Sequence, residues 1–143
     1  MMVSKSTSEL MDELMKSNNL ELYLKENSQY LVRDEISVYL SNILENKGLV
    51  KSAVIKKTEL SEVTGYQILA GTRKPSRDSL ICICVAMELG LEEIQSLLKA
   101  GGFAALYPKN ERDAIIISGI CGSMSVAGIN ELLFDNNEST LNK

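Results

Sequence analysis

The chain contains an internal repeat, in which residues 74–102 align with residues 109–137 without a gap, at an offset of 35. Each copy has the pattern of an apolar helix, a short break and a second apolar helix, which is typical of a helical hairpin. Two copies are fewer than a free-standing solenoid needs, so we expect the second hairpin to extend the core of the first. The alternative is a chance resemblance between two apolar hairpins. The identical positions are Lys74, Arg77, Asp78, Ile81, Ile94, Leu97 and Leu98 in the first copy, which match Lys109, Arg112, Asp113, Ile116, Ile129, Leu132 and Leu133 in the second.

The rest of the chain also has helical periodicity. Residues 6–9 have the pattern of a capping box, and apolar residues then recur at helical spacing. No stretch alternates polar and apolar residues long enough to indicate a strand, so the sequence predicts an all-α fold. Glycines and Pro75 mark helix ends. We expect helices before Asn18 and over residues 20–26, 33–47, 52–59 and 61–70, followed by the repeat from residue 78 to about 137.

Composition excludes several classes of function. The 143 residues include no His, which removes Ser-His-Asp and Cys-His catalysis and every His-containing zinc site. No Gly-rich phosphate loop, carboxylate pair or activated nucleophile is recognisable, so we expect no enzyme, no cofactor and no metal. No apolar run approaches the roughly 20 residues of a membrane span, and the first residues lack the apolar middle of a signal peptide. We therefore expect a soluble, cytoplasmic protein.

The three cysteines, Cys82, Cys84 and Cys121, all lie in apolar runs. A metal-binding or redox pair would be one interpretation of Cys82 and Cys84. Residues two apart on a helix, however, point about 200° away from each other, so these two side chains cannot bind one ion. We expect all three to be buried free thiols in a reducing cytosol.

Charge is distributed unevenly in a chain whose net charge is -4. Residues 51–78 hold six basic and three acidic side chains, whereas acidic side chains are in excess on both sides of this segment. A basic segment in an acidic protein is typical of a surface that faces phosphates, or of an ordinary solvated helix face. Charge alone leaves these two interpretations open.

Residues 49–94 resemble the lambda-repressor-like helix-turn-helix family of the Cro/C1 or XRE type. Residues 51–58 match its second helix, residues 59–60 its turn and residues 61–70 its recognition helix. The segment GTRKPSRDSL is similar to the junction that follows the recognition helix in this family, and MELGLEEI is similar to the end of the next helix. The resemblance implies an N-terminal helical extension over 1–30, a helix-turn-helix domain over 31–102 and a C-terminal hairpin over 103–143.

Three residues depart from the family pattern. The second helix usually has a small residue where this chain has Ile55, and the recognition helix usually has Val or Ile where it has Gly65. These two positions meet where the helices cross, so the exchange of large for small conserves volume. Glu59 stands where the turn usually has Gly with a positive φ, so we expect strain there, or a turn that is longer or differently shaped.

The resemblance implies a sequence-specific regulator of transcription that binds double-stranded DNA as a homodimer, with helix 61–70 in the major groove. Ser61 is expected to cap this helix. The implied base contacts are Ser61, Glu62, Thr64, Tyr66 and Gln67, and the implied phosphate contacts are Lys57, Arg73, Lys74 and Arg77. Three of these residues have another interpretation: Tyr66 as half-buried against the first helix, Glu62 as a plain surface charge, and Arg77 as part of a structural helix start.

A second interpretation remains open, namely a helical interaction or adaptor module on a helix-turn-helix scaffold that no longer binds DNA. The recognition helix contains no Lys or Arg, and the chain has a pI of about 4.9. A protein partner or a second copy would then bind the N-terminal stripe of Leu10, Met11, Leu14 and Met15, or the second hairpin around residues 115–134.

Overall fold

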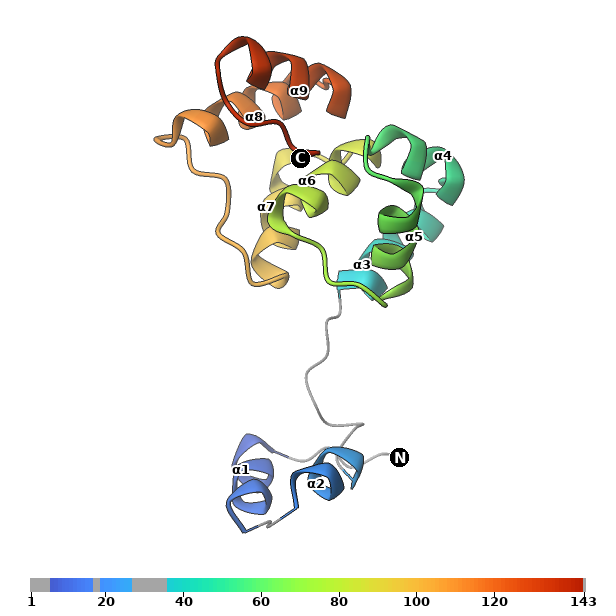
Figure 1. Ribbon diagram of the computed structural model, residues 1–143, viewed down its shortest axis with the longest axis vertical. Helices are drawn as coiled ribbons and strands as arrows, with labels where there is room; N and C mark the ends of the chain where they lie inside the picture. The colour runs from blue at the N-terminus through green and yellow to red at the C-terminus, as the bar shows by residue number, and fades with distance from the viewer. Residues whose placement is uncertain (1–5, 17–18, 27–35, 143) are drawn as a thin grey trace. The chain divides into compact units, whose positions relative to one another are not determined.

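The computed structural model describes residues 6–16, 19–26 and 36–142, with the side chains of residues 24–26 excepted. Every regular element in these residues is an α-helix, which confirms the all-α prediction. The chain divides into two compact units, residues 1–33 and 34–143, and α8 and α9 belong to the second (Figure 1). The helices are α1 (Thr7–Lys16), α2 (Leu20–Glu26), α3 (Ile36–Asn46), α4 (Lys51–Lys57), α5 (Glu62–Ala70), α6 (Arg77–Ala86), α7 (Leu91–Ala100), α8 (Glu111–Cys121) and α9 (Val126–Asp135).

The first unit contains α1 and α2, and polar side chains cap both helices. The Glu9 N–H donates to Ser6 Oγ at 3.1 Å, and the Leu22 N–H donates to Asn19 Oδ1 at 3.2 Å. These bonds occupy backbone donors that have no partner inside the helix. The predicted cap and the helix over 20–26 are thus confirmed. The domain boundary expected after residue 30 and the start of the helix expected at residue 33 lie outside the described residues.

The core of the second unit surrounds α6. Every residue from Leu80 to Ala86 is buried, because α6 packs against α4, α7 and α9. The sequence of α6 is apolar around its whole circumference, which is typical of a buried helix. Helix α5 packs against α3 and α4, so that α3, α4 and α5 together cover one part of this core.

The turn between α4 and α5 is short, and a buried threonine stabilises it. The Thr58 hydroxyl donates to the Ile55 carbonyl at 2.6 Å and accepts from the Leu60 N–H at 3.2 Å. Glu59 takes the left-handed conformation itself, with φ 61, so the turn is not lengthened to avoid it. A residue other than glycine in this conformation stores about 1 kcal/mol of strain.

The exchange of size between α4 and α5 is confirmed. A Cβ atom added to Gly65 would lie 3.1 Å from Cγ2 of Ile55. The Ile55 side chain on α4 therefore fills the space that a side chain at position 65 of α5 would occupy. Both residues are buried. Because interiors are close-packed, this arrangement keeps α4 and α5 in contact in spite of the two departures from the family pattern.

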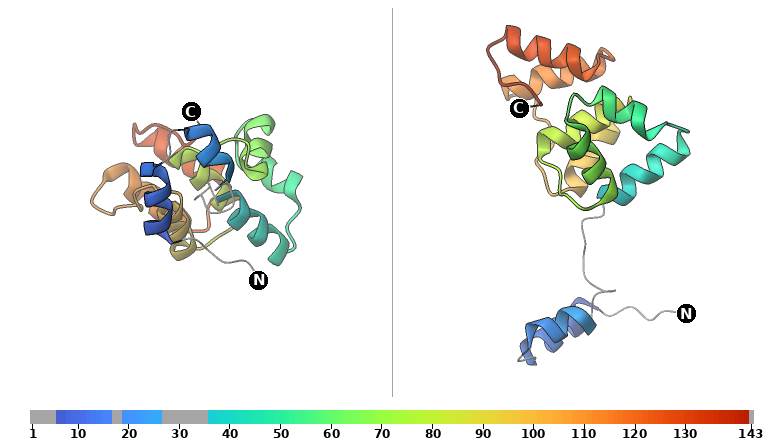
Figure 2. Two further views of the ribbon diagram at one scale, coloured as in Figure 1. Left: turned by 90° about the horizontal axis from the view of Figure 1, so that it is seen from below. Right: turned by 45° about the vertical axis from the view of Figure 1, so that its right-hand side comes forward.

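The repeat is also confirmed as a pair of helical hairpins, α6–α7 and α8–α9. Adding 35 to the bounds of α7 gives the bounds of α9, and α8 ends 35 residues after α6. Left-handed backbone positions recur at the same offset, at Glu88 and Ser123 and again at Gly102 and Asn137. Helix α6 packs against α9 and α7 against α8, so the two hairpins contact each other reciprocally (Figure 2).

Two reciprocal ion pairs join the hairpins. Arg77 forms a bidentate pair with Asp113, at 3.0 and 2.9 Å, and Arg112 forms one with Asp78, at 3.1 and 3.0 Å. Arg77 and Arg112 are equivalent in the repeat, and so are the two aspartates. The contact is therefore self-complementary, as in an interface between two subunits that are related by a twofold axis.

The equivalence continues beyond the segment aligned in the sequence. Each arginine also donates through Nε to a carbonyl of its own repeat, Arg77 to Ala104 and Arg112 to Ser139, in both cases at 3.0 Å. The second helix of each hairpin, α7 or α9, has a side-chain amide that binds the backbone of the segment after that helix. Gln95 Oε1 accepts from the Leu106 N–H, and Asn130 Oδ1 accepts from the Leu141 N–H. Leu106 and Leu141 are both buried, which extends each repeat by a loop that packs on its own hairpin.

The cysteines divide into two groups. Cys82 and Cys84 are buried in α6 as predicted, and burial raises the pKa of each thiol to about 12. The prediction for Cys121 was wrong, because this residue is exposed at the end of α8. Its equivalent Ala86 is buried in α6, a helix on which α4 also packs.

One thiol per folded chain is therefore expected to react with an aromatic disulfide reagent at pH 8, because attack requires an accessible thiolate. We expect Cys82 and Cys84 to react only after unfolding in guanidinium, as counted from the absorbance of the released thiolate. Cys121→Ser should remove the fast reaction and leave the slow one. Rapid reaction of three thiols in the folded chain would contradict this burial pattern.

Candidate nucleic-acid interface

Ser61 begins α5 as the predicted N-cap. Its backbone is extended, with φ -61 and ψ 147, and its Oγ accepts from the Thr64 N–H at 3.1 Å. The same hydroxyl donates to Thr64 Oγ1 at 2.8 Å. The first turn of α5 is therefore held by its own side chains, and the remaining free N–H groups give that end a partial positive charge.

The side chains implied to contact bases fall on the outer side of α5. Ser61, Glu62 and Tyr66 are exposed, whereas Thr64 and Gln67 are half-buried. Tyr66 is 40% exposed, so part of its side chain is covered by the domain and part faces outward. Residues on the opposite side of the helix, Ile68 among them, are buried.

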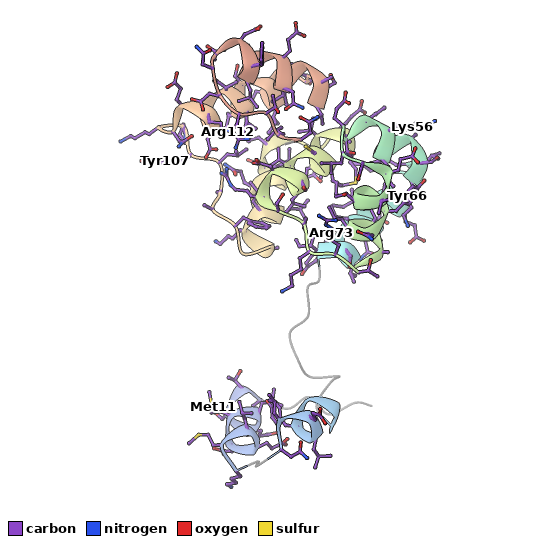
Figure 3. All side chains as sticks on the ribbon, viewed as in Figure 1. Met11, Lys56, Tyr66, Arg73, Tyr107 and Arg112 are labelled. Carbon is purple, nitrogen blue, oxygen red and sulfur yellow. The ribbon has the colours of Figure 1, made fainter. Side chains whose placement is uncertain are left out.

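Basic side chains contact this outer side at two places. Lys51 Nζ, at the start of α4, lies 6.0 Å from the centroid of the Tyr66 ring, which is a cation–π distance. Arg73 Nη1 donates to Gln67 Oε1 at 3.5 Å. Lys57 and Lys74 are exposed as well. In Figure 3, Lys56, Tyr66 and Arg73 follow one edge of the second unit, and Tyr107 and Arg112 lie on its other side.

Gly71 determines how the chain leaves α5 towards Arg73. Its φ of 82 is left-handed, and an added Cβ would lie 2.8 Å from Oγ of Ser37 in α3. The Gly71 N–H bonds to carbonyls of the last turn of α5, which ends the helix. Both the conformation and the close approach require glycine, and they direct the following residues back alongside Gln67.

Arg77 lies apart from this group of basic side chains. Its guanidinium is occupied by Asp113 and by the carbonyls of Ala104 and Ala105, and its side chain is mostly buried. The structure therefore places Arg77 in the contact between the two repeats, and we do not include it among the residues that face a phosphate. Its recurrence as Arg112 was the sequence signal for a structural role.

Sequence reasoning missed two contributors to the outer side of α5. Val63 is 66% exposed on this helix, and Lys51 contacts Tyr66 from α4. The spacing of Val63, Tyr66 and Ala70 at i, i+3 and i+7 is a helical stripe, and it could have been found by the same periodicity that located the helix.

Comparison with known protein families, with curated proteins and with solved structures finds no match to this chain. Within the described ranges, no helix is long and apolar enough to cross a membrane. In the same residues, no group of three or more Cys, Asp or Glu side chains is placed to hold a metal ion.

Proposed function

We propose that this protein is a sequence-specific DNA-binding regulator of transcription with a lambda-repressor-like helix-turn-helix domain, and that α5 reads the major groove. The observation that carries this proposal is that basic side chains lie on the exposed outer side of α5, although the chain as a whole is acidic. Lys51 contacts Tyr66 there, and Arg73 contacts Gln67. DNA responds to this local positive potential and not to the net charge of the protein.

In this proposal the residues divide into two roles. Gln67 forms a bidentate contact to adenine, Glu62 accepts from the amino group of cytosine, and Thr64 contacts a base or a phosphate. Phosphates are contacted by Lys51, Lys57, Arg73 and Lys74, which fix the position of α5 along the groove. Ser61, whose hydroxyl is engaged with Thr64, mainly orients the first turn of the helix.

The proposed active form is a homodimer. A single short recognition helix reads few base pairs, and two half-sites bound together multiply the affinity. The proposed DNA-binding domain spans residues 31–102, and its extension spans residues 103–143. Cytoplasmic location is part of the same proposal, because the regulator must reach the DNA.

A second candidate function is a helical interaction module. Within the first unit, α1 leaves three large apolar side chains exposed, at Met11, Leu14 and Met15. Exposed apolar stripes on an amphipathic helix are typical of helices that bind a groove of another protein. In this alternative, α1 supplies the partner contact and α5 has no ligand.

DNA binding is expected to be steeply salt-dependent. We would measure the fluorescence anisotropy of a labelled random-sequence duplex at about 50 and 200 mM salt. Each neutralised phosphate contributes about -0.9 to the slope of log affinity against log salt, so four contacts predict a loss of about 150-fold. The triple variant Lys57→Ala, Arg73→Ala, Lys74→Ala should lose most of this binding and most of the slope.

The matched control is Lys16→Ala, Lys99→Ala, Lys109→Ala, which removes the same charge from exposed positions elsewhere. It should bind nearly as the wild-type chain does. Equal losses in both triple variants would mean that only total charge matters, which argues against an interface at α5. Absence of binding by the wild-type chain at tens of micromolar protein and low salt would reject the DNA-binding function.

A further inference from the structure

The outer side of α5 is apolar along its middle. Val63, Tyr66 and Ala70 are exposed and lie at i, i+3 and i+7, so their side chains form one stripe along the helix. We call these three residues the α5 stripe. Isolated exposed apolar residues need no explanation, whereas neighbouring ones on one helix face offer apolar surface whose burial against a ligand is favourable.

Basic groups border the α5 stripe. Lys51 lies over the ring of Tyr66, and Arg73 contacts Gln67, which is one position beyond Tyr66 on the same helix. Exposed Lys57 precedes the turn into α5, and exposed Lys74 follows the helix. Glu62 is the one acidic side chain on α5 itself. The complementary ligand is therefore a polyanion that presents apolar groups between its charges.

Duplex DNA has this arrangement in its major groove. Phosphates line both edges, and the C5-methyl group of each thymine projects into the groove from its floor. An α-helix fits this groove, with its outward side chains against the base edges. A protein partner would have to place acidic residues on both sides of an apolar groove, which is a more particular requirement, so the charges favour DNA.

We propose that the α5 stripe recognises thymine methyl groups, with Val63 as the residue that determines this preference. The proposal rests on the proposed function and adds a base specificity to it. Val63 has no polar atom, so its discrimination between bases comes from burying a methyl group against its own two. Tyr66 extends the apolar contact, and Lys51 holds its ring by the cation–π contact.

The experiment uses the full chain and a duplex recovered by selection from a random pool. In this duplex, thymines are replaced one at a time by deoxyuridine, which removes the methyl group and keeps every hydrogen-bonding group. Burial of one methyl group corresponds to about a fourfold change in affinity. We expect at least one replacement to weaken wild-type binding by about this factor.

The variant Val63→Ala provides the test of the residue. At the sensitive thymine, the ratio of thymine to uracil affinity should fall from about fourfold towards one in Val63→Ala. The control variant Lys57→Ala should bind every duplex more weakly and leave the ratio unchanged. This comparison also removes any effect of the methyl group on the DNA itself, because such an effect would be the same for all variants.

The failures of the two proposals are distinguishable. The selected duplex could bind tightly and yet show no loss of affinity when any thymine is replaced by deoxyuridine. This result would overturn the methyl contact and leave DNA binding intact. An unchanged ratio in Val63→Ala would overturn the assignment to Val63. If no duplex is bound by the wild-type chain, both proposals fail.

Discussion

Arg77→Ala is expected to lower the free energy of unfolding by about 3 kcal/mol, the largest effect of any single side-chain truncation that we predict here. Arg77 makes two hydrogen bonds to Asp113, whose side chain is only 10% exposed. Without the guanidinium, this carboxylate stays in the contact between the hairpins and loses its bidentate partner. Arg112 is bonded to Asp78, so it acts on Asp113 only through its charge. Urea unfolding at pH 7, followed by circular dichroism, measures the change.

The repeat supplies the matched control. Arg112→Ala removes the equivalent arginine, but its partner Asp78 has a side chain that is 35% exposed. Water can solvate that carboxylate, so we expect a cost of about 1 kcal/mol. Equal effects of the two variants would contradict the difference in burial that the structure shows.

The pH dependence follows from the same carboxylate. Burial raises the pKa of Asp113, but hydrogen bonds from Arg77 and from the Tyr107 N–H, with the charges of both arginines, lower it below its usual range. Since the pKa is lower in the folded state, the stabilisation is present above the unfolded value of about 4 and is lost as the pH falls through the folded value. The difference between the wild type and Arg77→Ala should therefore shrink below about pH 4.

Gly119→Ala is expected to lower the free energy of unfolding by about 2 kcal/mol, although alanine favours a helix over glycine. A Cβ added to Gly119 in α8 would lie 2.5 Å from Cγ1 of Ile129 in α9. Ile129 is fully buried and branched at Cβ, so it cannot rotate away without a new clash. The two helices would have to separate. Urea unfolding again gives the magnitude.

Gly128→Ala in α9 is the control for helix propensity. Its added Cβ would meet Cε of Met124 at 3.2 Å, which is the flexible end of a half-buried side chain that can move. This variant should leave the stability unchanged or raise it by up to about 1 kcal/mol. The same sign for both substitutions would show that propensity, and not the close approach of α8 to α9, governs Gly119.

The close approach of α8 and α9 also marks a limit of the repeat. The positions equivalent to Gly119 and Ile129 hold Cys84 and Ile94, both fully buried, so the first hairpin has a side chain where the second has only a glycine. The sequence alignment predicts two hairpins correctly. It does not predict how near the helices of each hairpin come, because that depends on the size of a few side chains at the crossing.

The sequence predicts only part of the candidate interface, because the rest depends on side chains that meet through tertiary packing. The limits of α5, its Ser61 cap and its outward polar residues follow from local pattern. The exposure of Val63, the contact of Lys51 with Tyr66 and the occupation of Arg77 by Asp113 do not. Each of these depends on an element distant in the sequence, or on which side of α5 is covered by α3 and α4.

Local sequence specifies the helices and their caps, because hydrogen bonds and periodicity within a helix involve residues at most four apart. The 35-residue repeat is visible in the alignment of the two segments. The pairing of each arginine with an aspartate 36 or 34 residues away depends on tertiary packing, and so does the exposure of Cys121 when Cys82 is buried. Those outcomes depend on which helix faces meet in space. The periodicity of the sequence shows which face of a helix is apolar. Which other helix covers that face depends on how the side chains pack in three dimensions.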